Sequence, residues 1–173
     1  MVKIRVALAS LVCLLMVSPL IARDDSFLNF DGGIGVDPVS NVAVNAGVTT
    51  VSRNIVRGVN PPGQLWTIAA LKAEIDNNGR IQVRGRGLLL AGGNGIGTNA
   101  GQSVKATLIC GVATPVLSDT ATVPLEANGD FRIDDVLTPV PANPCESPVL
   151  LIRNPGGAWF AAGILKLDDN DKN

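Results

Sequence analysis

The absence of histidine decides which chemistry this sequence can carry. Its 173 residues include no His, and beyond residue 22 they include only two cysteines, Cys110 and Cys145. A Ser-His-Asp triad, a Cys-His dyad and a zinc or copper site with His ligands all need an imidazole. If Cys110 and Cys145 are oxidised, thiolate catalysis and Cys-ligated metals are excluded too. Carboxylate, Lys, Ser/Thr and calcium chemistry then remains.

Adjacent carboxylates occur three times, at Asp24–Asp25, Asp134–Asp135 and Asp168–Asp169. A glycosidase needs two carboxylates about 5–10 Å apart across a sugar. Neighbours on a strand point to opposite faces, so these pairs do not form such a dyad by themselves. Arg132 shares a polar face with Asp130 and Asp134, which predicts an exposed, salt-bridged surface. A carboxylate-based hydrolase therefore stays an alternative, with no catalytic residue assigned.

Three arginines alternate along the chain at Arg80, Arg84 and Arg86. On a strand this spacing puts all three side chains on one side. Such a row can bind an anionic ligand, and Arg84 and Arg86 are the residues we expect to contact it. The pattern favours cross-strand pairing on a wet face with acids of the neighbouring strand, Glu74 and Asp76, and anion binding is the alternative.

A glycine-rich run, GGNGIG at residues 92–97, follows the apolar stretch Leu88–Leu90. A phosphate-binding loop needs a helix next, but a β-patterned segment follows here and no Gly-Lys-Ser/Thr is present. The run is also similar to one nonapeptide of the calcium-binding β-roll, although Gly97 occupies the aspartate position. We expect a surface loop, with no cofactor or metal site. Asn94 in the loop 92–101 could complete the ligand surface of Arg84 and Arg86.

The first 22 residues have the pattern of a secretory signal peptide. Lys3 and Arg5 form a basic start, an apolar run follows from Val6 to Val17, and Ala22 is the small residue before the expected cut. A membrane span needs roughly 20 apolar residues, more than this run provides. We therefore expect a mature chain that begins at Arg23, is secreted or periplasmic, and has no membrane span after leader removal.

The charge of the mature chain is close to neutral. Of the 14 Lys and Arg residues, Lys3 and Arg5 belong to the leader, so 12 remain against 15 acidic residues, a net charge of −3. This balance lacks the basic footprint of a nucleic-acid binder. We expect no nucleic-acid partner. The partner we expect is an extracellular protein or surface component of unknown identity, and the oligomeric state stays open.

The cysteines fit export. Cys13 lies within the apolar run of the leader, which leaves Cys110 and Cys145 as an even pair. In an oxidising compartment such a pair favours a disulfide, and the alternative is two separate buried thiols. Apolar residues alternate along Val104–Cys110, which points Cys110 inward. Four prolines make residues 138–148 an irregular connection, so the bridge would pin a loop to a core strand.

Two segments share a strand–turn–strand pattern: IDNNGRIQV at residues 75–83 and LEANGDFRI at residues 125–133. Asn-Gly tolerates positive φ, so each segment predicts a tight antiparallel hairpin. The alternation gives each hairpin one face to bury and one to wet. The residues expected inside are Leu71, Ile75, Ile81, Val83, Val123, Leu125, Phe131 and Ile133.

Period-two alternation predicts further strands, since no long stretch has the 3.6-residue period of a helix. The predicted strands are Val42–Val51, Arg53–Val59, Val104–Cys110, Val149–Arg153 and Trp159–Leu165. The segment Leu65–Ile75 is also expected to be a strand. A short helix is its alternative, because Leu65, Ile68, Ala69 and Leu71 could line one helical face.

The residues ANGDFRI at 127–133 resemble the strand–turn–strand of prealbumin-like modules in secreted proteins. Together with about seven to nine short antiparallel strands and one disulfide, they predict a single-domain β-sandwich of immunoglobulin-like or prealbumin-like type. The domain is expected over residues 23–166, followed by a polar tail at 167–173. The function expected by exclusion is that of a non-catalytic module acting through surface interactions.

Overall fold

The structure, a computed structural model, describes residues 26–167. The predicted leader and all but the first residue of the predicted tail lie outside this range. In these residues every strand pair is antiparallel, and none of their elements is a helix long and apolar enough to cross a membrane. The strands are β1 (Ser26–Gly35), β2 (Val39–Asn45), β3 (Val48–Arg53), β4 (Trp66–Thr67), β5 (Ala70–Asp76), β6 (Arg80–Arg86), β7 (Leu89–Leu90), β8 (Ser103–Cys110), β9 (Val116–Asp119), β10 (Val123–Pro124), β11 (Phe131–Val136), β12 (Val149–Arg153) and β13 (Trp159–Leu165).

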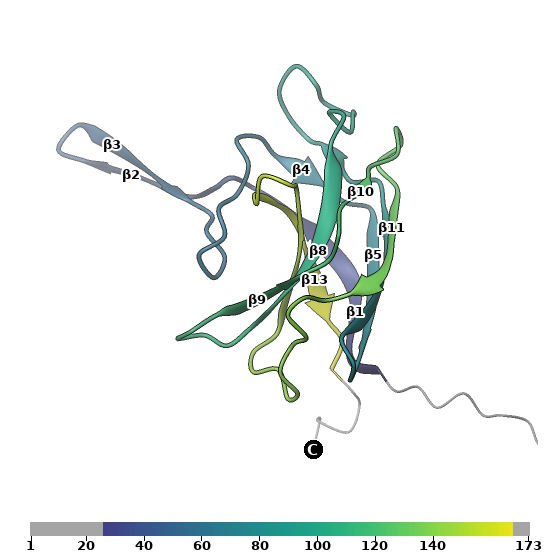
Figure 1. The fold of residues 1–173 in the computed structure, drawn as a ribbon. Coiled ribbons are helices and arrows are strands. Elements are labelled where there is room, and N and C mark those ends of the chain that lie inside the picture. Colours follow the sequence, from purple (N-terminus) through teal and green to yellow (C-terminus); the bar gives the residue numbers. More distant parts are fainter. Residues whose placement is uncertain (1–25, 168–173) are drawn as a thin grey trace, which may run out of the picture.

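The main sheet has the strand order β10-β8-β12-β13-β1-β5-β6-β11, with β9 added on β8. It curls into a half-barrel around the core (Figure 1). The predicted all-β class is confirmed, but the structure is not clearly the predicted two-layer sandwich. The right-handed twist of the strands and a register shift between Phe30 and Gly33 on β1 both favour this curl.

The core is built mainly from aliphatic side chains on the concave face of the sheet. Leu71 and Ile75 of β5, Leu108 of β8 and Leu150 of β12 are each at most 1% exposed. Five aromatic side chains are also buried, namely Phe30, Phe131, Trp159 and the pair of Trp66 and Phe160, which stack with ring centroids 4.1 Å apart.

The first Asn-Gly hairpin is confirmed. β5 and β6 pair around the turn at Asn78-Gly79, and Gly79 has a φ of 80°. The Asp76 carboxylate accepts hydrogen bonds from the backbone N–H groups of Asn78 and Arg80, which fixes the turn. All four residues predicted to be inside on this hairpin are buried: Leu71, Ile75, Ile81 and Val83.

The second Asn-Gly segment forms the predicted turn but not the predicted strand pair. Gly129 N–H donates to the Glu126 carbonyl, yet β10 pairs with β8 and β11 pairs with β6. β10 is only two residues long and ends at Pro124, which has no N–H to donate to a ladder. Leu125, Phe131 and Ile133 are buried as predicted, whereas Val123 is only half-buried.

The other predicted strands have mixed outcomes. Val104–Cys110, Val149–Arg153 and Trp159–Leu165 are confirmed within β8, β12 and β13. The segment Leu65–Ile75 is extended rather than helical, and it is divided into β4 and β5.

Two predictions in the N-terminal part are wrong. Val42–Val51 is not one strand but the two strands β2 and β3, with a two-residue turn at Ala46-Gly47. Both turn residues have positive φ, 50° and 79°, as a type I′ turn requires. Arg53–Val59 forms no strand beyond Arg53 and contributes one isolated bridge between Val56 and Val59.

The predicted disulfide is confirmed. Cys110 at the end of β8 is bonded to Cys145, with Cα atoms 5.1 Å apart. Cys145 lies in the proline-rich connection between β11 and β12, and both cysteines are buried. The bridge thus holds an irregular segment against the end of a core strand.

Candidate functional site

The hairpin β2–β3 is the most unusual surface of the molecule. It projects away from the curled sheet (Figure 1), and none of the 22 residues from Asp37 to Gly58 is buried. Val42, Val44, Val48 and Val51 are each between 57% and 66% exposed. Val42, Val44 and Val51 share one face of the ribbon, and Val48 lies on the other. Neighbouring apolar side chains at the surface mark interaction sites far more often than an isolated exposed leucine or valine does.

The hairpin also has no charged residue short of Arg53, the last residue of β3. No acidic or basic residue occurs between Asp37 and Arg53. Val42 stands opposite Val51, and Val44 stands opposite Thr49, so these four side chains share one face. Edge strands are ordinarily protected from association by charged side chains, and this hairpin has none between Asp37 and Arg53.

Both long edges of the hairpin are open. β2 and β3 form a two-stranded sheet with no third strand among residues 26–167. Asn45 and Val48 flank the two-residue turn, so they exchange both hydrogen bonds, and the next pair, Val44 and Thr49, turns its N–H and C=O groups outward. By the same alternation the backbone groups of Val51 point outward from β3.

The stem of the hairpin is fixed to the body. The Asn54 N–H donates to the Pro38 carbonyl, and the Asn54 side chain donates to the Asp37 carbonyl. Arg53 donates to the Pro61 carbonyl, and the Trp159 indole donates to the Asn54 carbonyl. Hydrogen bonds thus close the stem of the hairpin and connect it to the body.

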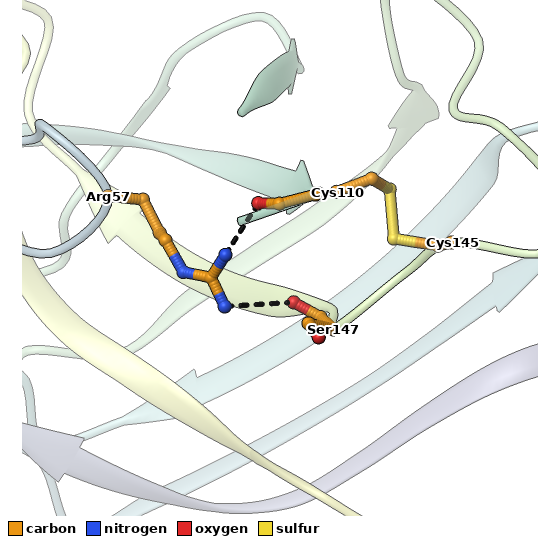
Figure 2. The surroundings of a disulfide bond; sticks show 5 residues. Arg57, Cys110, Cys145 and Ser147 are labelled. Atoms are coloured by element: carbon orange, nitrogen blue, oxygen red, sulfur yellow. Dashed lines mark hydrogen bonds between the residues drawn. A yellow bond between two sulfur atoms is a disulfide. The ribbon is translucent and has the colours of Figure 1, made fainter. Parts of the chain in front are cut away.

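Arg57 ties the segment after the stem to the disulfide region. Its guanidinium donates to the carbonyls of Gly111 and Ser147, which flank Cys110 and the Cys145 segment (Figure 2). Arg57 has a φ of 47°, a backbone conformation that is uncommon for residues other than glycine. The two hydrogen bonds give a structural reason for that conformation.

The predicted ligand surface lies on the convex face of β5, β6 and β11. Arg84 stands directly opposite Lys72 on one side and Arg132 on the other, a row of three cations. Asp31 pairs with Lys72 at 3.5 Å, while Arg84, Arg86 and Arg132 form no ion pair with any residue of the described range. Like charges directly opposite each other oppose folding, so this row has no stabilising role in the sheet.

The predicted pairing of the arginines with Glu74 and Asp76 is wrong. Arg80 instead pairs with Asp134 of β11, at 2.7 Å, and Glu74 stands opposite Gln82. The Asp76 carboxylate accepts hydrogen bonds from backbone N–H groups of the β5–β6 turn. The predicted exposed, salt-bridged face is confirmed in part: Arg132 and Asp134 share the exposed face of β11, and Asp134 forms a salt bridge, although its partner is Arg80. Asp130 instead accepts a hydrogen bond from the Gly87 N–H.

The glycine-rich loop is a tightly turned surface loop. The N–H groups of Ile96, Gly97 and Thr98 donate to carbonyls of Gly93, Leu90 and Gly95, so they are not directed at a ligand. Asn94 is exposed. Arg84 lines a hollow of about 160 Å³ with Lys72, Glu74 and Gln82, and no residue of the loop lines it. Anion binding by Arg84, Arg86 and Asn94 stays a prediction.

A compact ionic cluster connects β8, β9 and β12. The Asp119 carboxylate accepts from Lys105 Nζ and Thr107 Oγ1, and Arg153 Nη1 lies 3.4 Å away. Burial raises the pKa of Asp119, but the hydrogen bonds from Lys105 and Thr107 and the charges of Lys105 and Arg153 lower it more. The net effect is a pKa below the ordinary value, because the cluster favours the carboxylate form.

We expect Asp119→Asn to lower the free energy of unfolding at pH 7 and to make that free energy depend less on pH in acid. The folded-state pKa is lowered, so the cluster stabilises the protein above the unfolded-state pKa of about 3.9 and loses this effect as pH falls through the folded pKa. Urea unfolding at pH 7 and at successive values below pH 4 measures both. Asp31→Asn, in an exposed pair, is the control and should change little. Equal unfolding free energies for Asp119→Asn and wild type at every pH would contradict the assignment.

Sequence reasoning did not identify the hairpin as a candidate site. The signal present in the sequence is the uncharged, valine-rich stretch at residues 38–52, within which the alternation predicts one ordinary strand, Val42–Val51. The chain matches no protein-family model, no curated protein and no solved structure.

Proposed function

We propose that this chain is an exported, non-catalytic β-domain that acts through surface contacts, with the β2–β3 hairpin as its contact element. The observation that carries this proposal is the hairpin itself: 22 consecutive residues with none buried and no charge between Asp37 and Arg53. Folding of the body gives no reason for a projecting ribbon of valines. Binding to another surface does, because it removes that apolar area from water.

Two features support export. The first 22 residues have the basic, apolar and small-residue regions of a secretory leader. The disulfide between Cys110 and Cys145 belongs to an oxidising compartment. The partner is an extracellular protein or surface component. The immunoglobulin-like or prealbumin-like form of the fold stays a prediction, and the proposed function does not depend on it.

Binding of an anionic ligand is the second candidate function. The observation that favours it is the row of Lys72, Arg84 and Arg132 on three adjacent strands. Oxyanions bound along this row would offset the repulsion between its cations.

A screen of the purified protein against glycoside, ester, peptide and phosphoester substrates tests the non-catalytic assignment. We expect no turnover above the buffer rate. Glu74 and Asp134 stand on either side of Gln82, so their backbones are two strand spacings apart, about 9–10 Å. That separation suits a pair of catalytic carboxylates, but both residues lie on the open convex face and not across a cleft. Amide variants of the candidate acids should behave like wild type: Glu74, Asp76, Glu126, Asp130 and Asp134. Turnover that disappears in one of them would overturn the proposal and favour a carboxylate-based hydrolase.

A further inference from the structure

The isolated hairpin is incomplete as a structure. A two-stranded ribbon in water is marginally stable, and a third strand or a packed apolar face is what makes such a ribbon stable. In this chain β2 and β3 receive neither, because their sheet has two strands and their valines are exposed. The element that completes the hairpin must therefore come from outside residues 26–167 or from another molecule.

β3 is the better of the two edges for pairing. β2 has a register shift between Val39 and Asn41, and such irregularities weaken an edge. β3 is regular from Val48 to Arg53, and its sequence VTTVSR is rich in β-branched residues. Thr49 and Val51 direct their N–H and C=O groups outward from β3. The Arg53 side chain donates a hydrogen bond to the Pro61 carbonyl of the body, so its charge is directed away from this edge.

We propose that β3 pairs antiparallel with β3 of a second copy of this chain, which gives a four-stranded sheet β2-β3-β3-β2. This inference rests on the proposed function, since it names the partner of the same hairpin. The pairing centres on Thr50, so Thr49 of each copy exchanges backbone hydrogen bonds with Val51 of the other. A two-fold axis then relates the copies, and each surface is its own complement.

Three observations favour a second copy over another partner. First, a symmetric contact brings two copies of the same segment together, so a charged segment would face its own charge, and the hairpin has no charge between Asp37 and Arg53. Second, the outward backbone groups of Thr49 and Val51 lie symmetrically about Thr50, so the open edge of β3 is complementary to itself. Third, antiparallel pairing brings the turn of one copy toward the stem of the other, where Ile55 is 53% exposed.

The same observations argue against a membrane as the occupant. β2 and β3 have seven and six residues, fewer than the roughly 9–11 that a membrane-spanning strand needs. Neither strand has an aromatic residue for the interface between lipid and water.

Sedimentation equilibrium of the purified full chain, after its natural processing, tests the proposal with two matched proline variants. Thr49→Pro removes an outward N–H of β3 and leaves the β2–β3 ladder intact, while Val44→Pro makes the same change on the outer edge of β2. We expect wild type and Val44→Pro to dimerise. Thr49→Pro should raise the dimer dissociation constant about ten-fold or more, because symmetry removes two hydrogen bonds at once. Val51→Lys should act similarly through repulsion between the two copies.

Folding and specificity controls accompany these measurements. Unchanged thermal unfolding shows that the body of each variant is intact, and Ile96→Lys, at an exposed position of the glycine-rich loop, should leave the dimer unchanged. A wild type that is monomeric at all concentrations would overturn self-pairing. Equal weakening of the dimer by Thr49→Pro and Val44→Pro would also overturn it, as would binding of the monomer to neutral phospholipid vesicles. A monomer without turnover overturns self-pairing alone, whereas turnover that requires a carboxylate overturns the proposed function.

Discussion

Replacing both Cys110 and Cys145 by serine is expected to lower the free energy of unfolding by about 3–4 kcal/mol. The bridge links residues 35 positions apart, so it removes many conformations from the unfolded chain. In the folded state it holds the proline-rich connection against the end of β8. That connection forms no strand between residues 139 and 148, and few ladder hydrogen bonds can replace the bridge.

Urea unfolding followed by tryptophan fluorescence measures this loss, because Trp66 and Trp159 are both buried and report on the core. Wild type treated with a thiol reductant is the matched control and should unfold like the double variant. A loss below about 1 kcal/mol, the contribution of one hydrogen bond, would contradict the account. It would mean that the contacts of Arg57 with Gly111 and Ser147 hold this region without the bridge.

Phe160→Ala should cost about 3–5 kcal/mol, the range for deleting a large buried aromatic side chain. Phe160 is 2% exposed and stacks on Trp66 with an interplanar angle of 10°. The Phe160 carbonyl accepts a hydrogen bond from the Val36 N–H, and the Val36 carbonyl accepts one from the Trp66 backbone N–H. Both aromatic residues are therefore bonded to Val36, which directly precedes the hairpin stem. The substitution would weaken the base that holds β2 and β3.

The same unfolding measurement, followed by circular dichroism, checks this prediction without relying on Trp66 fluorescence. Phe160→Leu keeps most of the volume and should cost clearly less than the alanine variant. An alanine variant as stable as the leucine variant would show that the stack is not part of the stabilising core.

The elements that sequence reasoning predicted well are those specified by local signals. In the β5–β6 hairpin, Asn78-Gly79 supplies the turn and the alternation on each side supplies the buried face, so the register follows. The disulfide also followed from local facts, the even number of cysteines and the inward direction of Cys110.

What could not be predicted depends on distant parts of the chain. Leu125 donates to the Gln102 carbonyl, which directs β10 to β8 and away from β11. The curl of the sheet requires close approaches such as that of Gly35, where a Cβ atom would come 2.1 Å from the Trp66 carbonyl oxygen. Neither contact leaves a signal in the neighbouring sequence.

The hairpin was missed for a different reason. Alternating valines ordinarily predict a strand with one buried face, and Val42, Val44 and Val51 are exposed instead. The turn residue Ala46 adopts a φ of 50°, which alanine rarely does, so no Asn-Gly or Gly-Gly signal divided the stretch. Because these valines are exposed where the alternation predicts burial, we assign the hairpin to function and not to the core.

Hydrogen exchange of the hairpin amides at two protein concentrations tests most directly whether β2–β3 is the contact element. If a second copy pairs with β3, the outward N–H groups of Thr49 and Val51 should exchange freely in dilute protein and become protected as concentration rises. The amides of β5 and β6, within the main sheet, should be protected equally at both concentrations. Rapid exchange at Thr49 and Val51 that does not change with concentration would contradict the account.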